Sequence, residues 1–228
     1  MSIAENLARI NRRIATVADP AGITLVAASK TNSADKIREA IGAGVRVFGE
    51  NRVQEMVEKT EQHAYDGAEL HFIGHLQSNK VKQVVGRVGL IQSVGSLKLA
   101  ELIDGRAREL GIVQRVLAEI NVGNEDAKTG FSVEFFDKNL YNLTKLPNIS
   151  LCGLMTIPPV VDDPQEAAYY FEKVAKIAID ISPELCDNGR QAILSMGMSA
   201  DLEVAIAAGA NMIRVGAALF GTRERAGD

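Results

Sequence analysis

The sequence predicts a single (β/α)8 barrel of the TIM type, formed by one domain that covers residues 1–228. Three observations support this fold class. Strand-like segments alternate with helical patterns, the strand-like segments are almost continuously apolar, and the length is typical of one barrel. A doubly wound open sheet is the alternative, but eight strand–helix units in 228 residues suit a closed barrel better.

The predicted elements follow one another along the chain. An amphipathic helix near residues 2–18 comes first, with apolar residues at helical spacing. Strands are predicted at 23–30, 45–49, 70–74, 90–94, 114–121, 149–156, 192–196 and 212–216. Helices are predicted near 33–43, 51–63, 78–86, 96–110, 133–145, 164–181 and 199–208. Gly44, Gly111 and Gly209 follow three of these helices, as glycine commonly does at a helix C-terminus.

Composition excludes several classes of function. The net charge is −4 and no basic stripe is visible, which argues against nucleic acid as a partner. There is no signal-peptide pattern, and no apolar run is long enough to span a bilayer. The two cysteines, Cys152 and Cys186, form no CxxC motif, and the three histidines form no HExxH motif. We therefore expect no disulfide framework, no metal site and a location in the cytoplasm.

Lys30 is the most informative residue of the chain. It ends the apolar run 23–29, at the C-terminal end of the first predicted strand, where barrels of this class carry their active sites. An ammonium group is costly to bury there unless it is paired or deprotonated, and a deprotonated lysine forms Schiff bases with carbonyl compounds. The alternative is a side chain that reaches solvent from the strand end, and this segment alone does not decide between the two.

The loops after the last two strands predict an anion site. Residues 195–199 lead into the predicted helix 199–208, and Ser199 is a suitable N-cap for it. The free N–H groups of a helix N-terminus favour a phosphate, and these loops are the usual phosphate site of such barrels. Gly216 and Ala217 offer a second stretch of accessible backbone. Ordinary capping of a surface helix is the alternative.

Arg214 is expected to point into the barrel. Strand alternation places Ile213 and Val215 on the face toward the helices and Arg214 on the other face. A buried guanidinium needs an acceptor. Glu50 or Glu119 could supply it, or the ring nitrogen of a ligand could face it.

Three other residues receive weaker assignments. His75 is interpreted as a residue bonded to neighbouring backbone rather than as a base. Asn51 either caps the helix predicted at 51–63 or contacts a ligand. Cys152 is interpreted as a small core residue.

Six segments, in this order along the chain, resemble the pyridoxal phosphate homeostasis protein family (YggS/PROSC). These segments are residues 28–31 (ASKT), 48–55 (FGENRVQE), 71–80 (HFIGHLQSNK), 153–157 (GLMTI), 195–201 (SMGMSAD) and 214–221 (RVGAALFG). Each string is weak alone, but all six in order are specific. They extend from the first predicted strand to the last, whereas the loop 124–128 matches only loosely.

The resemblance implies a barrel of the alanine racemase N-terminal type, without that enzyme's second domain, and pyridoxal 5'-phosphate (PLP) as cofactor. Lys30 would hold PLP as an internal aldimine, Arg214 would face the pyridine nitrogen, and Ser199, Gly216 and Ala217 would hold the phosphate. The implied cofactor-binding set is Lys30, Asn51, Met198, Ser199, Arg214, Gly216 and Ala217, with no catalytic residue.

The expected function is PLP binding in vitamin B6 homeostasis, without enzymatic turnover. A guanidinium beside the pyridine nitrogen stays charged and cannot accept a proton from it. The ring nitrogen is then expected to be unprotonated, which weakens the cofactor as an electron sink. Partners would be apo-enzymes that depend on PLP, and we expect a monomer. One alternative is a PLP-dependent amino-acid racemase or lyase. Another is a barrel of the class I aldolase kind, which would use Lys30 on a sugar phosphate without a cofactor.

Overall fold

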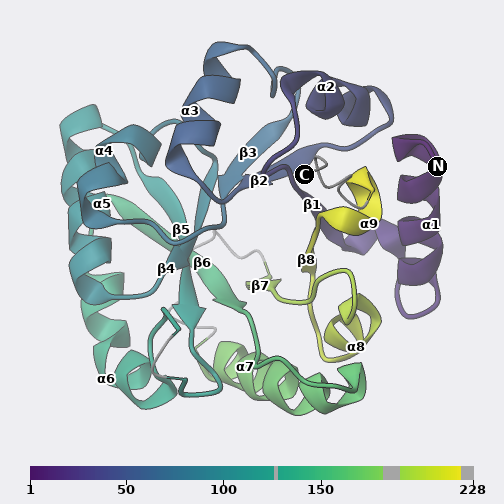
Figure 1. Ribbon diagram of the computed structural model, residues 1–228. Coiled ribbons are helices and arrows are strands. Elements are labelled where there is room, and N and C mark those ends of the chain that lie inside the picture. Colours follow the sequence, from purple (N-terminus) through teal and green to yellow (C-terminus); the bar gives the residue numbers. More distant parts are fainter. Residues whose placement is uncertain (126–127, 182–190, 222–228) are drawn as a thin grey trace, which may run out of the picture.

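Eight parallel strands close into a barrel in chain order, and helices surround it in the computed structural model, which describes residues 1–125, 128–181 and 191–221 (Figure 1). The strands are β1 (Thr24–Ala28), β2 (Val47–Glu50), β3 (Glu69–Phe72), β4 (Leu90–Val94), β5 (Gln114–Ile120), β6 (Ile149–Thr156), β7 (Ile193–Ser195) and β8 (Met212–Val215). Because β1 pairs with both β2 and β8, the closed barrel is confirmed and the open sheet is excluded.

The helices occupy the segments between strands, close to their predicted positions. The α-helices are α1 (Ile3–Ala15), α2 (Ala34–Gly42), α3 (Val53–Glu61), α4 (Val81–Val84), α5 (Leu97–Leu110), α6 (Val133–Thr144), α7 (Ala168–Asp180), α8 (Leu202–Ala207) and α9 (Ala217–Phe220). Three short 3-10 segments are η1 (Pro20–Gly22), η2 (Ser78–Lys80) and η3 (Pro164–Ala167). No helix within these described ranges is apolar over a length that could cross a membrane.

Local signals explain where several helices begin and end. Ser2 and Glu5 form a capping box at the start of α1, so two backbone N–H groups gain acceptors there. Ser96 caps α5, and Gly111 ends it in the left-handed conformation with φ 66°. This conformation is costly for residues with a Cβ, which explains the glycine.

Two predicted helix starts are wrong. The helix predicted at 199–208 is the shorter α8, and its N-cap is Asp201 rather than Ser199. The helix predicted at 51–63 begins at Val53 with Arg52 as N-cap, so Asn51 is not its cap. In both cases a polar residue near the helix suggested the cap, but the backbone enters the helix one or two residues later.

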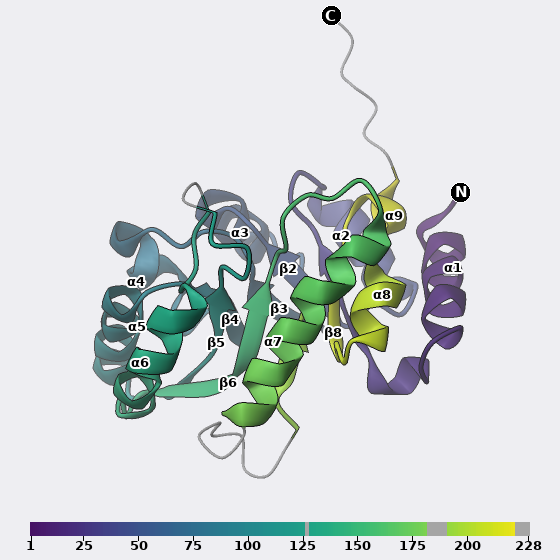
Figure 2. The ribbon, with the colours of Figure 1, turned by 90° about the horizontal axis from the view of Figure 1, so that it is seen from below.

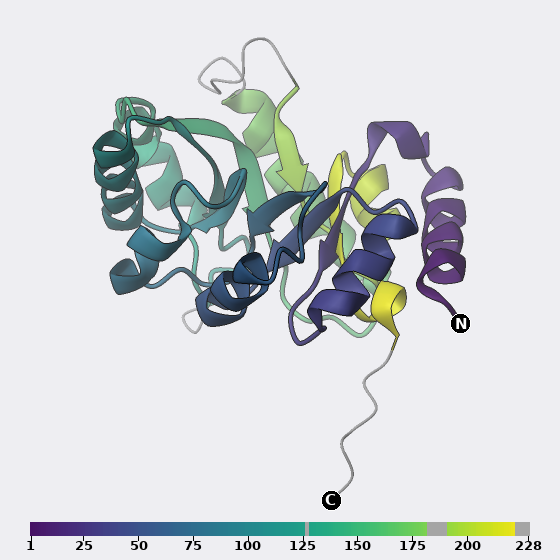
Figure 3. The same ribbon diagram turned by 90° about the horizontal axis from the view of Figure 1, so that it is seen from above.

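Helix α1 lies outside the ring of strand–helix units, beside α8 and α9 (Figures 2 and 3). The buried Asn6 side chain donates a 2.8 Å hydrogen bond to the carbonyl of Leu219. Arg13 forms a bidentate pair with Glu203, at 2.5 and 2.6 Å. Since these partners lie in α9 and α8, α1 fixes the two helices that follow β7 and β8.

Apolar side chains divide into an outer core and a barrel interior. The interior cluster contains Val26, Ile73, Leu90, Leu117, Cys152, Met155 and Met212, with Ala28 packed against it. Ala27 belongs instead to the larger cluster between strands and helices. Alternation along β1 therefore turns Val26 and Ala28 inward, and it fixes which side chains reach the site at the C-terminal ends of the strands. Cys152 is a buried core residue as predicted, while Cys186 lies outside the described residues.

Candidate functional site

Lys30 lies at the C-terminal end of β1, in a turn just past the strand. Alternation from Val26 and Ala28 places it on the inward column of β1, at the end of the barrel that we call the mouth. Its side chain is exposed, whereas the preceding Ser29 is fully buried. The amine is thus presented at the mouth rather than buried in the strand layer.

The residues on both sides of Lys30 are held by hydrogen bonds. The carbonyl of Ser29 accepts a 2.9 Å bond from Nζ of Lys59. The amide of Thr31 donates a 2.7 Å bond to Oε2 of Glu55, and Thr31 has a positive φ of 63°. A non-glycine residue in this region is uncommon and needs support from its surroundings. The turn that carries Lys30 is therefore fixed by two side chains of α3.

A buried polar cluster behind this turn centres on Glu50, whose side chain has no exposed surface. Its Oε1 accepts bonds from Lys59 at 2.6 Å, from the Tyr65 hydroxyl at 2.7 Å and from Ser29 Oγ at 2.7 Å. Burial and the nearby Glu50 charge raise the pKa of Tyr65. Burial would raise the pKa of Glu55, but hydrogen bonds from Thr31 and Lys59 lower it overall.

Sequence reasoning did not single out Lys59 or Tyr65. One signal was available, because Glu55 and Lys59 are four residues apart and form an ion pair on one face of α3. Nζ of Lys59 has acceptors on Glu50, on Glu55 and on the Ser29 carbonyl, at 2.6, 3.1 and 2.9 Å. These three acceptors engage all three N–H groups of an ammonium. Lys59 therefore has a supporting role. Of these two lysines, Lys30 is the one with an available amine.

Arg214 points into the barrel as predicted, and its side chain is buried. Its acceptors are the carbonyl and Oγ of Ser195, both 2.7 Å from Nη1, and the carbonyl of Thr156, 2.9 Å from Nη2. Burial lowers the pKa of Arg214 to about 10, so the guanidinium still carries its charge at neutral pH.

Neither glutamate that the sequence suggested as a partner bonds to Arg214. Glu50 points away from the barrel interior and pairs with Lys59. Glu119 accepts from the Thr129 hydroxyl at 3.1 and 3.2 Å. The sequence could not exclude these carboxylates, because it does not show that main-chain carbonyls are within reach of the guanidinium.

The guanidinium has donors left for a ligand. Three of its five N–H groups are used by Ser195 and Thr156. No other acceptor for Arg214 is found within the described ranges, so Nε–H and one N–H of Nη2 remain. Val26 on β1 pairs with Arg214 on β8, and Lys30 lies four residues after Val26, in the turn that follows β1. Arg214 thus lies on the strand beside β1, and Lys30 lies nearer the mouth.

The loops after β7 and β8 lie beside this pair. The carbonyl of Ser199 accepts a 2.9 Å bond from Nη1 of Arg13, and the amide of Met198 donates a 2.6 Å bond to Oδ1 of Asp201. Gly216 precedes Ala217, the first residue of α9. A Cβ atom built at Gly216 would meet the Cβ of Ala28 at 3.5 Å, so this glycine packs directly against the inward column that leads to Lys30.

Asn51 carries an unsatisfied polar atom next to Lys30. Its Oδ1 is buried and has no hydrogen-bond partner in the described part of the chain. Ala28 pairs with Gly49, so two residues further on Asn51 stands beside Lys30. A buried carbonyl oxygen without a donor is uncommon, and a ligand at the mouth would offer one.

His75 and Glu119 line a cavity of about 300 Å³ on the other side of the mouth, between the ends of β3, β4 and β5. Burial raises the pKa of Glu119, against the opposing effects of Thr129 and of the Arg214 charge. Contrary to expectation, no hydrogen bond joins the His75 ring to the described backbone around it. No group of three or more metal-ligating side chains occurs within the described residues.

Comparison with known proteins identifies the family of this chain and agrees with its fold. The model of the alanine racemase N-terminal domain family matches residues 2–224. A curated relative from Aquifex aeolicus, named pyridoxal phosphate homeostasis protein, is 43% identical, and the match covers 98% of this chain and all of the relative. A protein of the same name from Escherichia coli K12 is 39% identical, with 97% of both chains covered. The solved structure of PipY from Synechococcus elongatus with PLP bound is 36% identical, with a TM-score of 0.85 over 96% of this chain and all of that one.

Proposed function

This chain belongs to the pyridoxal phosphate homeostasis protein family, whose barrel is that of the alanine racemase N-terminal domain, and we propose that it binds PLP at the barrel mouth and serves PLP homeostasis. The observation that carries the proposal is the pairing of an exposed lysine at the mouth with a buried arginine on the neighbouring strand. The PLP-bound relative of the same fold supports it.

Lys30 would hold the cofactor covalently. Its amine would condense with the aldehyde of PLP, so that a carbon–nitrogen double bond forms and one water molecule leaves. The contacts that Ser29 and Thr31 make with Lys59 and Glu55 would keep the lysine aimed at the mouth. The alternative reading of Lys30, a cation that merely reaches solvent, does not explain why its turn is held by two side chains of α3, the buried Lys59 and the partly buried Glu55.

Arg214 would donate to the pyridine nitrogen with the N–H groups that Ser195 and Thr156 leave free. Because a guanidinium only donates, the ring nitrogen would act as acceptor and carry no proton. When bound, PLP supplies an electron sink for reactions of amino acids, and an unprotonated ring makes that sink weak. This chemistry supports carriage of the cofactor rather than its use in catalysis.

Ser199, Gly216 and Ala217 would hold the phosphate, with Met198 beside it and Asn51 close to Lys30. The proposal no longer rests on Ser199 as a helix cap. It rests on the loop after β7, which α1 supports through Arg13, and on Gly216 after β8, which packs next to Ala28. The unsatisfied Oδ1 of Asn51 would gain a donor from a bound ligand or from a water molecule that accompanies it.

The relatives are named for a homeostatic role and not for a reaction. We therefore propose that the protein passes PLP to apo-enzymes, acts in the cytoplasm and works as a monomer with one domain. An amino-acid racemase or lyase is the second candidate, since the family shares the alanine racemase barrel. His75 and Glu119 at the adjoining cavity are the groups that such a reaction would use as bases.

Absorbance with added PLP separates these functions. The wild type should develop a yellow band that Lys30→Ala lacks, which excludes a barrel that uses the lysine on a sugar phosphate alone. Transfer is then tested by mixing the loaded protein with a PLP-dependent apo-enzyme and measuring its recovered activity. Turnover of an amino acid well above that of free PLP, abolished by Lys30→Ala, would instead establish the racemase or lyase.

A further inference from the structure

A continuous series of hydrogen bonds runs through the barrel interior, beginning at Arg214. Oγ of Ser195 lies 2.7 Å from Nη1 of Arg214 and 2.6 Å from Oε1 of Gln92. Nε2 of Gln92 lies 2.9 Å from Nδ1 of His71, whose Nε2 lies 3.0 Å from Oε1 of Glu69. We call these five side chains the interior relay. They come from four different strands.

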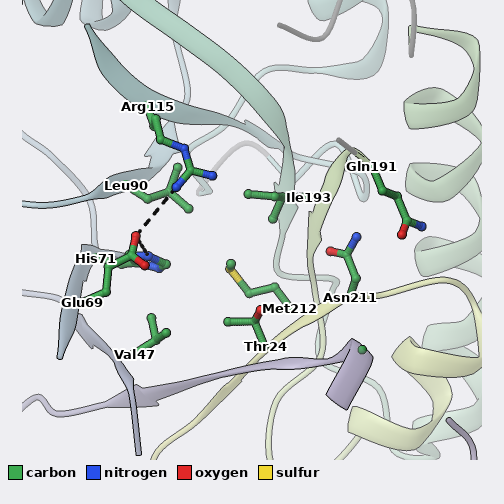
Figure 4. Close-up of a pocket in the computed structure, with 11 residues that line it drawn as sticks. Thr24, Val47, Glu69, His71, Leu90, Arg115, Gln191, Ile193, Asn211 and Met212 are labelled. Carbon is green, nitrogen blue, oxygen red and sulfur yellow. Dashed lines mark hydrogen bonds and ion pairs between the residues drawn. The ribbon is translucent and has the colours of Figure 1, made fainter. Parts of the chain in front are cut away.

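The relay is shielded from solvent except at Glu69, the residue farthest from Arg214. Ser195 and Gln92 have no exposed surface, and His71 is 2% exposed. Glu69, by contrast, has 44% of its side chain exposed and lines a cavity of about 300 Å³ at the end of the barrel opposite the mouth. Figure 4 shows Glu69 and His71 in this cavity, opposite Asn211. The relay thus connects the buried guanidinium with the opposite end of the barrel.

The donors and acceptors of the relay can be assigned from one end, because arginine has no acceptor. Arg214 donates to Oγ of Ser195, and the Ser195 hydroxyl donates to Oε1 of Gln92. The Gln92 amide then donates to Nδ1 of His71, and its second N–H faces the sulfur of Met212 at 3.2 Å. Each contact between neighbouring members of the relay then joins one donor to one acceptor.

This order leaves a single state for the histidine. Nδ1 of His71 accepts, so the ring is neutral and its proton lies on Nε2, from where it donates to Glu69. The hydrogen bond from His71 and the nearby Arg115 charge lower the pKa of Glu69. In this order the relay runs in one direction, from a cation to an anion.

We propose that the interior relay positions the Arg214 guanidinium, and that Ser195, Gln92 and His71 are positioning residues for it. The main-chain carbonyls of Ser195 and Thr156 hold Nη1 and Nη2 of Arg214, and the Ser195 hydroxyl is a further acceptor for Nη1. This hydroxyl is itself held by Gln92, which contacts His71. For the ligand identity this inference rests on the proposed function, but its structural content does not require PLP.

Nuclear magnetic resonance of the protein without cofactor tests the relay directly. With 15N-labelled histidine, His71 should be neutral and protonated on Nε2 at neutral pH. The Nε–H signal of Arg214, assigned by its loss in Arg214→Lys, should show the order of rigid backbone, S² about 0.85. His71 with its proton on Nδ1, or charged, would overturn the assigned direction.

Variants test the positioning role. In Gln92→Leu and Ser195→Ala, the order of the Arg214 Nε–H group should fall below about 0.6, the value of a flexible group. Leu117→Val is the matched control, because Leu117 is fully buried in the same interior but makes no side-chain hydrogen bond. If Gln92→Leu does not fold, Ser195→Ala and His71→Gln give the same test. An unchanged Arg214 in these variants, or an equal loss in Leu117→Val, would refute the proposal.

A second readout tests the link to the ligand. Gln92→Leu and Ser195→Ala should weaken PLP binding about tenfold, the lower range for one hydrogen bond to a charged group. They should also shift the pH at which the absorbance of bound PLP changes, which a merely structural substitution such as Leu117→Val would not do. If the wild type binds no PLP, the proposed function is refuted but the relay is not. The relay is tested separately, by the protonation of His71 and the order of the Arg214 Nε–H group in the protein without cofactor.

Discussion

Nζ of Lys59 lies 2.6 Å from Oε1 of Glu50, and both side chains are buried behind the turn that presents Lys30. The pair lies outside the barrel wall, whereas Lys30 lies at its mouth. The chain therefore separates two lysines by environment. One is fixed as an ammonium by three acceptors, and the other is exposed and available for condensation with an aldehyde.

Removal of Lys59 should destabilise the protein and loosen the turn of Lys30. Lys59→Met leaves the Glu50 carboxylate buried without its cation, which typically costs about 3–5 kcal/mol of unfolding free energy. Urea unfolding of the two proteins measures this loss. The control is Arg38→Met, which breaks an exposed pair with Asp35 and should cost at most about 1 kcal/mol. Equal losses for both variants would show that Glu50 has another route to compensation.

The phosphate contacts should depend on space at Gly216. Gly216→Ala is tolerated by the protein, since its Cβ would make only an ordinary 3.5 Å contact with Ala28. Gly216→Val should greatly weaken PLP retention, because its methyl groups would occupy the approach of the phosphate. Equilibrium dialysis measures how tightly each of the two variants retains PLP. Thermal unfolding checks that each variant folds. Retention in Gly216→Val equal to wild type would place the phosphate elsewhere.

Ser199 should contribute one hydrogen bond to the phosphate. Ser199→Ala should weaken PLP binding by about 1.5–3 kcal/mol, the usual value for a hydrogen bond to a charged group. Its own carbonyl bond to Arg13 is main-chain and should survive the substitution. Thr16→Ala, which removes an exposed hydroxyl elsewhere, is the control for general effects. A dissociation constant unchanged in Ser199→Ala would remove the hydroxyl from the site.

Glu119 gives the stability a specific pH dependence. Burial raises its pKa in the folded protein, so the folded state holds this proton more tightly than the unfolded state. The ionised carboxylate therefore destabilises the fold as the pH rises through that raised pKa. Glu119→Gln should be more stable than wild type near pH 8, and the difference should vanish near pH 4, where glutamate is largely protonated in both states. Urea unfolding at both pH values measures the difference in unfolding free energy between Glu119→Gln and wild type. A difference that grows toward acid pH would contradict the raised pKa of Glu119.

The alternation of side chains along strands predicted the positions of several residues at the barrel mouth. The apolar pair Ile213 and Val215 was enough to turn Arg214 inward, and the position of Lys30 after an apolar run placed it at the mouth, because strand geometry is local. The closed barrel followed from repeated strand–helix units. These features depend on residues close together in the sequence, and hydrophobic patterns record them well.

The supporting contacts could not be predicted in the same way. Gln92 and Ser195 are 103 residues apart, and Asn6 and Leu219 are 213 apart, so only the closed fold brings them together. Helix α9 has four residues, too few to show a helical period. Ser199 misled as a cap because Asp201, two residues later, lies at the actual start of α8.

Arg214 should be required for tight binding but not for the covalent link. Arg214→Ala removes the side chain that we propose donates to the pyridine nitrogen, and we expect the PLP dissociation constant to rise about tenfold or more. Lys30 should nevertheless react in this variant, because its turn is held by α3 and not by β8. Spectrophotometric titration with PLP gives the affinity. Binding as tight as that of wild type would remove Arg214 from the site.

Borohydride reduction of the PLP-loaded protein, followed by peptide mass mapping, identifies the lysine that holds PLP. Reduction converts the carbon–nitrogen double bond into a stable amine, so the attached lysine keeps the phosphopyridoxyl mass. We expect this mass on the peptide that contains Lys30, and we expect Lys59, whose three N–H groups are engaged, to be unmodified. Labelling confined to Lys59, Lys80 or Lys128, with Lys30 unmodified, would show that Lys30 does not form the aldimine.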